Sequence, residues 1–162
     1  MLALFCMTKV AWAVHAAATG ANDTHADAGF VSKAVTTGQD EAAASTTAVR
    51  MTASRALKAV AKIISADLRE VSDQLLEIAR AKGLPIPARH ASGNEQNYAS
   101  GNEQSYSDAA FIEREIKSHL EAIALYEDEA SSSDAQLRAF AQRILPQLQR
   151  HLALLRSLKS GK

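Results

Sequence analysis

The chain lacks the residues from which several kinds of site are built. Its single cysteine is Cys6, near the N-terminus, so neither an internal disulfide nor a thiolate metal site can form. Prolines number 3, and aromatic residues make up 5% of the sequence. With few helix breakers and few bulky rings, the composition favours helices that pack closely through small side chains.

Neither sign of charge is in excess. Lys and Arg together number 18, as do Asp and Glu, so charge alone would not attract nucleic acid or an anionic membrane. No glycine-rich phosphate loop is present, and no serine lies in a nucleophile-elbow context. We therefore expect a protein that is not an enzyme, binds no nucleic acid and carries no organic cofactor.

The first 18 residues resemble a secretory leader. They are mostly apolar and contain two small-residue sites of the A-x-A kind, Ala11-Trp12-Ala13 and Ala16-Ala17-Ala18. Lys9 interrupts the apolar run, which is shorter than a membrane-spanning helix needs. We expect a leader over residues 1–18, a linker over residues 19–26 and a periplasmic or secreted protein without a stable membrane span. The alternative is the frayed N-terminal tail of a cytoplasmic protein.

The rest of the chain has the periodicity of four helices. Apolar residues recur every three or four positions over residues 26–50, and again from an N-cap at Ser54 to a stop at Gly83. Two further stripes follow Asp108 and Asp134, which we predict to be N-caps. Pro146 lies inside the last stripe and should kink that helix. The length suits one domain, so we predict an all-α antiparallel four-helix bundle over residues 27–159.

A long loop is predicted between the second and third helices, over residues 84–106. It contains a tandem repeat, ASGNEQNY over residues 91–98 and ASGNEQSY over residues 99–106. The repeat is polar except for its tyrosines and is typical of a low-complexity linker. The alternative is that Tyr98 and Tyr106 contact a partner.

Four ionisable residues lie on or beside the inner faces of the predicted helices, namely Glu41, Asp67, His119 and His151. A buried carboxylate or imidazole is unfavourable unless it is paired. Such a cluster therefore either satisfies its own hydrogen bonds or binds a divalent metal. At 1.5 Å per helical residue, the four residues spread over roughly 12 Å, while Asp67 and His151 lie nearly level and should form a contact.

The spacing does not match the usual di-iron signature of a helical bundle. That signature requires Glu-x-x-His on two helices and a Glu on each of the others. Here Glu115 stands four residues before His119, and Gln147 stands four before His151. The residues are therefore compatible with either a hydrogen-bonded structural cluster or a degenerate metal site.

Several segments resemble the DUF4142 family of predicted exported bacterial proteins. Residues 27–34, DAGFVSKA, and residues 38–41, GQDE, resemble the opening of that family. Phe111, His119 and Tyr126 resemble its aromatic, histidine, aromatic series, and residues 145–152, LPQLQRHL, resemble its Leu-Pro-x-Leu-x-x-His ending. The resemblance implies a ferritin-like four-helix fold over residues 27–158.

The resemblance implies no particular activity, because ferritin-like describes an architecture and not a reaction. The chain also departs from the family in the second helix. Where the family commonly carries Asp-His, this sequence has Asp67-Leu68, which removes an imidazole from the bundle interior.

Two functions from different classes follow from these observations. The first is a non-enzymatic exported bundle that interacts with an unidentified protein partner, in the cell envelope or in stress tolerance. The second is a ferritin-like metal-binding protein that uses Glu41, Asp67, His119 and His151. Either function allows a homodimer, for which the alanine-rich helix over residues 26–50 is the expected contact face.

Overall fold

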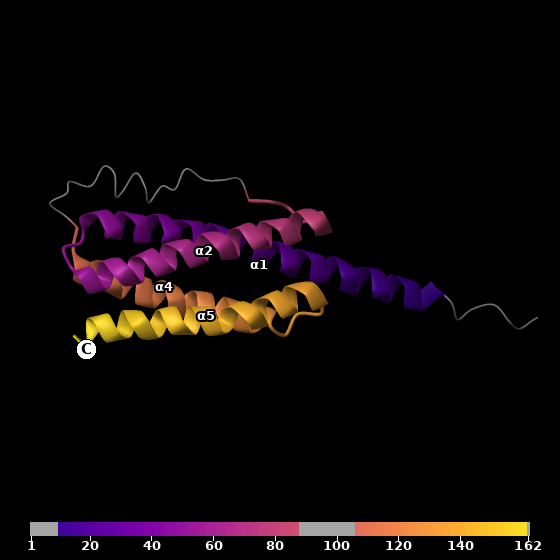
Figure 1. Cartoon of the computed structure of the whole chain (residues 1–162). Coiled ribbons are helices and arrows are strands. Elements are labelled where there is room, and N and C mark those ends of the chain that lie inside the picture. Colours follow the sequence, from indigo (N-terminus) through magenta and orange to yellow (C-terminus); the bar gives the residue numbers. More distant parts are fainter. Residues whose placement is uncertain (1–9, 88–105, 162) are drawn as a thin grey trace, which may run out of the picture.

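The computed structural model describes residues 10–87 and 106–161, and for residues 10–24 it describes the backbone alone. Four helices account for most of these residues: α1 (Val10–Met51), α2 (Arg55–Lys82), α4 (Asp108–Glu129) and α5 (Ala135–Lys159). They lie side by side in one bundle (Figure 1). The predicted all-α four-helix bundle is confirmed.

The bundle consists of two helical hairpins. α1 packs on α2 and α4 packs on α5, while α1 also contacts α4 and α2 also contacts α5. Figure 1 shows that α2 ends at one end of the bundle, whereas α4 begins at the opposite end. It follows that α2 and α4 run in the same direction. The helices within each hairpin are antiparallel, because only a few residues connect them and they pack against each other.

The predicted helix boundaries are confirmed at most positions. Ser54 caps α2 by accepting a hydrogen bond from the Leu57 amide, and Asp134 caps α5. The prediction for the third helix was wrong by one residue, because Ser107 is the N-cap of α4 and Asp108 is its first residue. The Asp108 carboxylate instead accepts a hydrogen bond at 2.8 Å from the hydroxyl of Thr52, at the end of α1.

The first helix is longer than the sequence indicated. It begins at Val10 and not at residue 26, so it continues through the predicted linker and much of the predicted leader. The added segment is rich in alanine, which has the highest helix propensity. In Figure 1 this part of α1 projects beyond the other helices. Among the described residues, no helix is both long and apolar enough to span a membrane.

α2 ends at Lys82 and α4 begins at Asp108, and the tandem repeat predicted between them lies outside the described residues apart from Tyr106. The ring of Tyr106 packs 6.5 Å from the ring of Phe111, centroid to centroid. Its hydroxyl is buried. Tyr106 therefore belongs to the end of the bundle, and the expected role of Tyr98 stays a prediction.

The hydrophobic core consists of two clusters and also contains buried polar side chains. The larger cluster includes Phe30, Ile64, Leu75, Leu137 and Leu148, and the smaller one gathers around Leu57 and Phe111 near the turn between α1 and α2. The polar layer consists of the buried Glu41, Glu115, His119 and His151, with Asp67 at its edge. The candidate site lies in this layer.

Two glycines should respond in opposite ways to substitution by alanine. Gly83 has φ 66° at the C-cap of α2, a left-handed conformation that disfavours a Cβ, so Gly83→Ala should destabilise the fold by about 1 kcal/mol. Gly29 lies within α1, and a Cβ there would meet nothing within 4 Å. Gly29→Ala should therefore stabilise the fold by about 0.5–1 kcal/mol. Urea denaturation measures both changes in stability. An equal effect of the two substitutions would contradict the left-handed conformation of Gly83.

Candidate functional site

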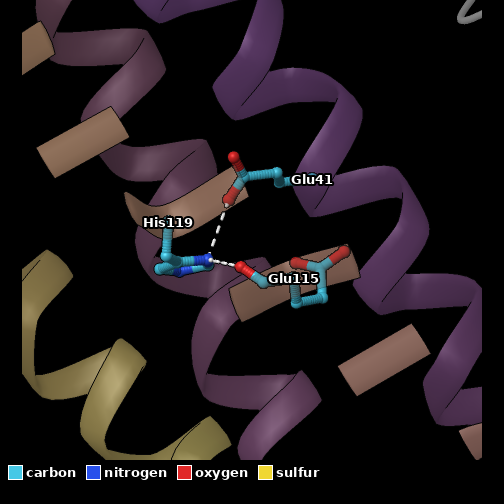
Figure 2. Close-up of side chains that lie close together, drawn as sticks. All are labelled: Glu41, Glu115 and His119. Atoms are coloured by element: carbon cyan, nitrogen blue, oxygen red, sulfur yellow. Dashed lines mark hydrogen bonds and ion pairs between the residues drawn. The ribbon is translucent and has the colours of Figure 1, made fainter. Parts of the chain in front are cut away.

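Three buried side chains from two neighbouring helices meet in the polar layer. Glu41 comes from α1, while Glu115 and His119 come from successive turns of α4 (Figure 2). One carboxylate oxygen or imidazole nitrogen from each lies within 4.8 Å of the others. The side chains are 5%, 1% and 0% exposed, respectively. The site is thus enclosed within the bundle.

The tautomer of His119 follows from its backbone contact. Its Nδ1 lies 2.9 Å from the carbonyl oxygen of Glu115, and a carbonyl can only accept. Nδ1 therefore carries the proton and donates it, and Nε2 is left as a buried acceptor without a hydrogen-bond partner among the described residues. The same Nδ1 lies 3.2 Å from Oε2 of Glu41.

The two glutamates are only partly satisfied by their surroundings. Oε1 of Glu41 accepts a hydrogen bond from the Ser118 hydroxyl at 2.6 Å. Oε1 of Glu115 lies 3.9 Å from the Arg114 guanidinium. Within the described part of the chain, Oε2 of each glutamate is buried without a hydrogen bond. Unpartnered buried carboxylate oxygens are rare in folded proteins and call for a physical explanation.

Burial favours the uncharged forms of the three side chains in this cluster. Desolvation raises the pKa of Glu41 to about 7, and desolvation together with the nearby Glu41 carboxylate raises the pKa of Glu115 to about 8. Desolvation lowers the pKa of His119 to about 4. The contact between Glu41 and His119 is therefore not an ion pair at neutral pH, and the carboxyl groups retain protons that a cation could displace.

A second pair completes the polar layer from the other two helices. Nε2 of His151, on α5, donates a hydrogen bond at 2.8 Å to Oδ2 of Asp67, on α2. Partial burial alone would raise the pKa of Asp67, but hydrogen bonds from Gln147 and His151 outweigh it and lower the pKa below its usual value. Asp67 is therefore ionised and fixes His151 with a proton on Nε2.

The two histidines link the pair to the glutamate cluster. The ring centroids of His119 and His151 lie 5.6 Å apart, and the rings meet edge to face. Nδ1 of His151, like Nε2 of His119, is buried without a hydrogen-bond partner among the described residues. Desolvation by burial lowers the pKa of His151, so this ring is also neutral near pH 7.

The structure brings all four sequence-predicted residues into one connected layer. Glu41, His119 and His151 are buried, and Asp67 lies at the edge with 23% of its side chain exposed. The predicted contact between Asp67 and His151 is confirmed. Their use as metal ligands stays a prediction.

Sequence reasoning missed Glu115 as a member of the site. Ile116 also fits the apolar period of this helix, but Glu115 is buried and Ile116 is only partly so. The spacing of Glu115 and His119, four residues apart, already placed both on one helix face. That spacing does not fit the Glu-x-x-His pattern. The apolar Ile116 lies next to Glu115, so from the sequence Ile116 is the expected core residue.

Replacing Asp67 by asparagine should release His151. Asp67→Asn removes the ionised acceptor of a partly buried hydrogen bond, so we expect a loss of about 1–2 kcal/mol of folding free energy. Imidazole ¹⁵N NMR should also show His151 no longer held in the Nε2–H tautomer. Asp73→Asn, at an exposed position on the same helix, is the control. An unchanged tautomer in Asp67→Asn would contradict the role assigned to this carboxylate.

The family comparison covers almost the whole of the described bundle. The family described as "Domain of unknown function (DUF4142)" matches residues 13–158. The chain belongs to the DUF4142 family. The match extends the predicted resemblance, and it includes every residue of the polar layer. No curated protein and no solved structure matches the chain.

Membership of DUF4142 assigns no activity, because the family is described as a domain of unknown function. Function therefore has to be inferred from the chemistry of the polar layer. In this DUF4142 chain that layer draws on all four helices, through Glu41, Asp67, Glu115, His119 and His151.

Proposed function

We propose that this chain is a metal-binding helical-bundle protein in which Glu41, Glu115 and His119 bind one divalent cation. The observation that supports the proposal is the enclosed cluster of two carboxyl groups and an imidazole within 4.8 Å of one another, with carboxylate oxygens that lack hydrogen-bond partners among the described residues. A bound cation would explain why these groups are kept in the core.

The ligand atoms lie at separations close to those that one ion requires. Imidazole nitrogens and carboxylate oxygens bind transition metals at about 2.0–2.2 Å, so two ligands of one ion lie at most about 4.4 Å apart. The observed limit of 4.8 Å exceeds this by a few tenths of an ångström, which side-chain rotation can supply. Carboxylate and imidazole ligands suit Fe²⁺, Mn²⁺ or Zn²⁺.

Binding a cation at this site has to release protons. Near neutral pH the carboxyl group of Glu115 is largely protonated and that of Glu41 is partly protonated, because their pKa values are raised to about 8 and about 7, respectively. His119 is neutral and carries its proton on the nitrogen that faces Glu41, so binding through that nitrogen would move the proton to Nε2 without releasing it. A cation would replace the carboxyl protons and neutralise the two carboxylates. Affinity should therefore rise with pH.

The pair of Asp67 and His151 is proposed to support the site from α2 and α5. Metal-binding histidines commonly donate their other nitrogen to a carboxylate, which orients the ring. His151 has this arrangement, because Nε2 donates to Asp67 and Nδ1 is left without a hydrogen bond. We therefore assign Asp67 to orientation of His151 and not to direct metal binding, which revises the ligand set expected from the sequence.

Native mass spectrometry of the full chain tests this function. After removal of metal by a chelator, the protein is incubated with Fe²⁺, Mn²⁺ or Zn²⁺ and its mass is compared with that of the metal-free chain. The proposal expects the addition of one ion by at least one of these metals. An unchanged mass with all three would refute the proposal.

The second candidate function is the one expected from the sequence, a non-enzymatic bundle that interacts with an unidentified protein partner. The hydrogen bonds from His119 to the Glu115 carbonyl and from His151 to Asp67 support it, because a polar layer can specify helix packing without metal.

Two further proposals rest on the sequence. The first is that the protein is exported to the periplasm or outside the cell, and the second is that it is not an enzyme. Cell fractionation of the native organism's protein tests export, and recovery in the cytoplasmic fraction would contradict it.

A further inference from the structure

One member of the proposed site borders a cavity between α1 and α4. The cavity has a volume of about 40 Å³ and is lined by Thr37, Gly38 and Glu41 of α1 and by Glu121 and Ala122 of α4, among others. This space could hold roughly three water molecules. Glu115 and His119 are not among its lining residues, so Glu41 is the member of the cluster that faces the cavity.

The outer part of this cavity reaches the protein surface. Glu121 is 65% exposed, and Lys33 on α1 is also exposed. The other lining residues become apolar toward the interior, where Leu68 of α2 and Leu148 of α5 are buried. The cavity thus connects an exposed rim to a carboxyl group that is otherwise enclosed.

Gly38 lines the cavity on the α1 side. A Cβ at Gly38 would lie 2.9 Å from the Ser72 hydroxyl, so α1 and α2 approach closely at this point. Negative charges also lie near Glu41, since Glu121 lines the same cavity and Asp40 is the neighbour of Glu41 on α1. The same charges favour an approaching cation.

We propose that this cavity is the path by which a divalent cation reaches Glu41 from the solvent and then passes to Glu115 and His119. The inference rests on the proposed metal-binding function and adds the route and the residues that control it. Glu121 attracts the cation at the rim, and Glu41 is its first buried ligand. Ala122 is partly buried in the wall of the cavity, between Glu121 at the rim and the interior.

The test measures the rate of Co²⁺ uptake and release by the full chain, using Co²⁺ as a visible substitute for Zn²⁺. Ala122→Leu should fill the path and slow both association and dissociation by about tenfold, because opening would then require helix motion. The dissociation constant should stay unchanged, because no ligand is altered. Ala124→Leu, at an exposed position on the same helix, is the matched control.

A second pair of variants tests the rim without changing the core. Glu121→Lys and Glu113→Lys alter the same charge on the same helix, and both side chains are 65% exposed and paired with a lysine. Only Glu121 lines the cavity. Association of Co²⁺ should therefore be slowed severalfold more by Glu121→Lys than by Glu113→Lys.

The outcomes separate the route from the metal site itself. If wild-type protein binds Co²⁺ and Ala122→Leu leaves both rates unchanged, the route is overturned and the metal site stands. Should Ala122→Leu fail to fold, equal rates in the two lysine variants would overturn it instead. If wild-type protein gives no Co²⁺ absorption and no metal mass shift, the proposed function fails and the route fails with it.

Discussion

Replacing His119 by alanine is expected to abolish stoichiometric binding of a divalent cation. The imidazole is the only nitrogen donor within the cluster of Glu41, Glu115 and His119, and its loss leaves two buried carboxyl groups that ionise poorly on their own. Loss of an outer-shell partner alone lowers metal affinity by about 10–100-fold. Loss of a direct ligand should therefore lower it on the order of 100-fold or more.

A zinc titration with a competing chromophoric chelator measures this effect. The matched control is His25→Ala, because His25 is exposed on α1 and is not in the cluster. Glu115→Gln should also weaken binding strongly, whereas Glu113→Gln on the exposed face of α4 should not. Equal affinities for wild type and His119→Ala would show that zinc binds elsewhere.

The metal-free protein is expected to lose stability as the pH rises from about 6.5 to about 8. Glu41 and Glu115 have pKa values raised from 4.5 to about 7 and about 8, respectively. In this range the folded state holds protons that the unfolded state has released, so raising the pH favours unfolding. At about 1.4 kcal/mol per pKa unit, the decline should be on the order of 2–3 kcal/mol.

The histidines act in the opposite direction and at lower pH. Burial lowers the pKa of His119 from 6.5 to about 4, so the unfolded state binds more protons below about pH 6.5 and acid favours unfolding. Stability should therefore be greatest at mildly acidic pH. Above about pH 6.5 the histidine contribution is complete, and the decline reports on the raised carboxyl groups.

Urea denaturation in the presence of a chelator, near pH 6 and near pH 8, tests this dependence. Glu129 also has a pKa raised to about 7, by burial and by Asp27, so some decline should persist outside the site. Glu115→Gln should reduce the decline by about 1 kcal/mol or more, while Glu113→Gln should leave it unchanged. Equal stability of the wild type at both pH values would contradict the burial of neutral carboxyl groups.

Most of the fold could be predicted because local signals agreed with the tertiary packing. Ser54, Gly83 and Asp134 mark helix ends by side-chain and backbone preferences that depend on few neighbours. The start of α1 could not be predicted in the same way. Alanine-rich residues form helix readily but also resemble a leader, and periodicity cannot separate the two.

Part of the site could also be predicted from local signals in the sequence. Glu41, His119 and His151 stood out because each interrupts an apolar stripe, and helical rise placed Asp67 level with His151. Glu115 was hidden by the adjacent Ile116, since a small rotation of α4 decides which of the two faces the core. That rotation depends on packing against α1 and α5, which one helix's sequence does not specify.

The most direct test of the metal site is anomalous diffraction from a crystal of the full chain prepared with zinc. Data collected on both sides of the zinc absorption edge would locate the ion without reference to the assigned ligands. We predict one anomalous peak within bonding distance of the carboxylates of Glu41 and Glu115 and the imidazole of His119. A zinc peak only at surface residues, with these three side chains unchanged, would contradict the account.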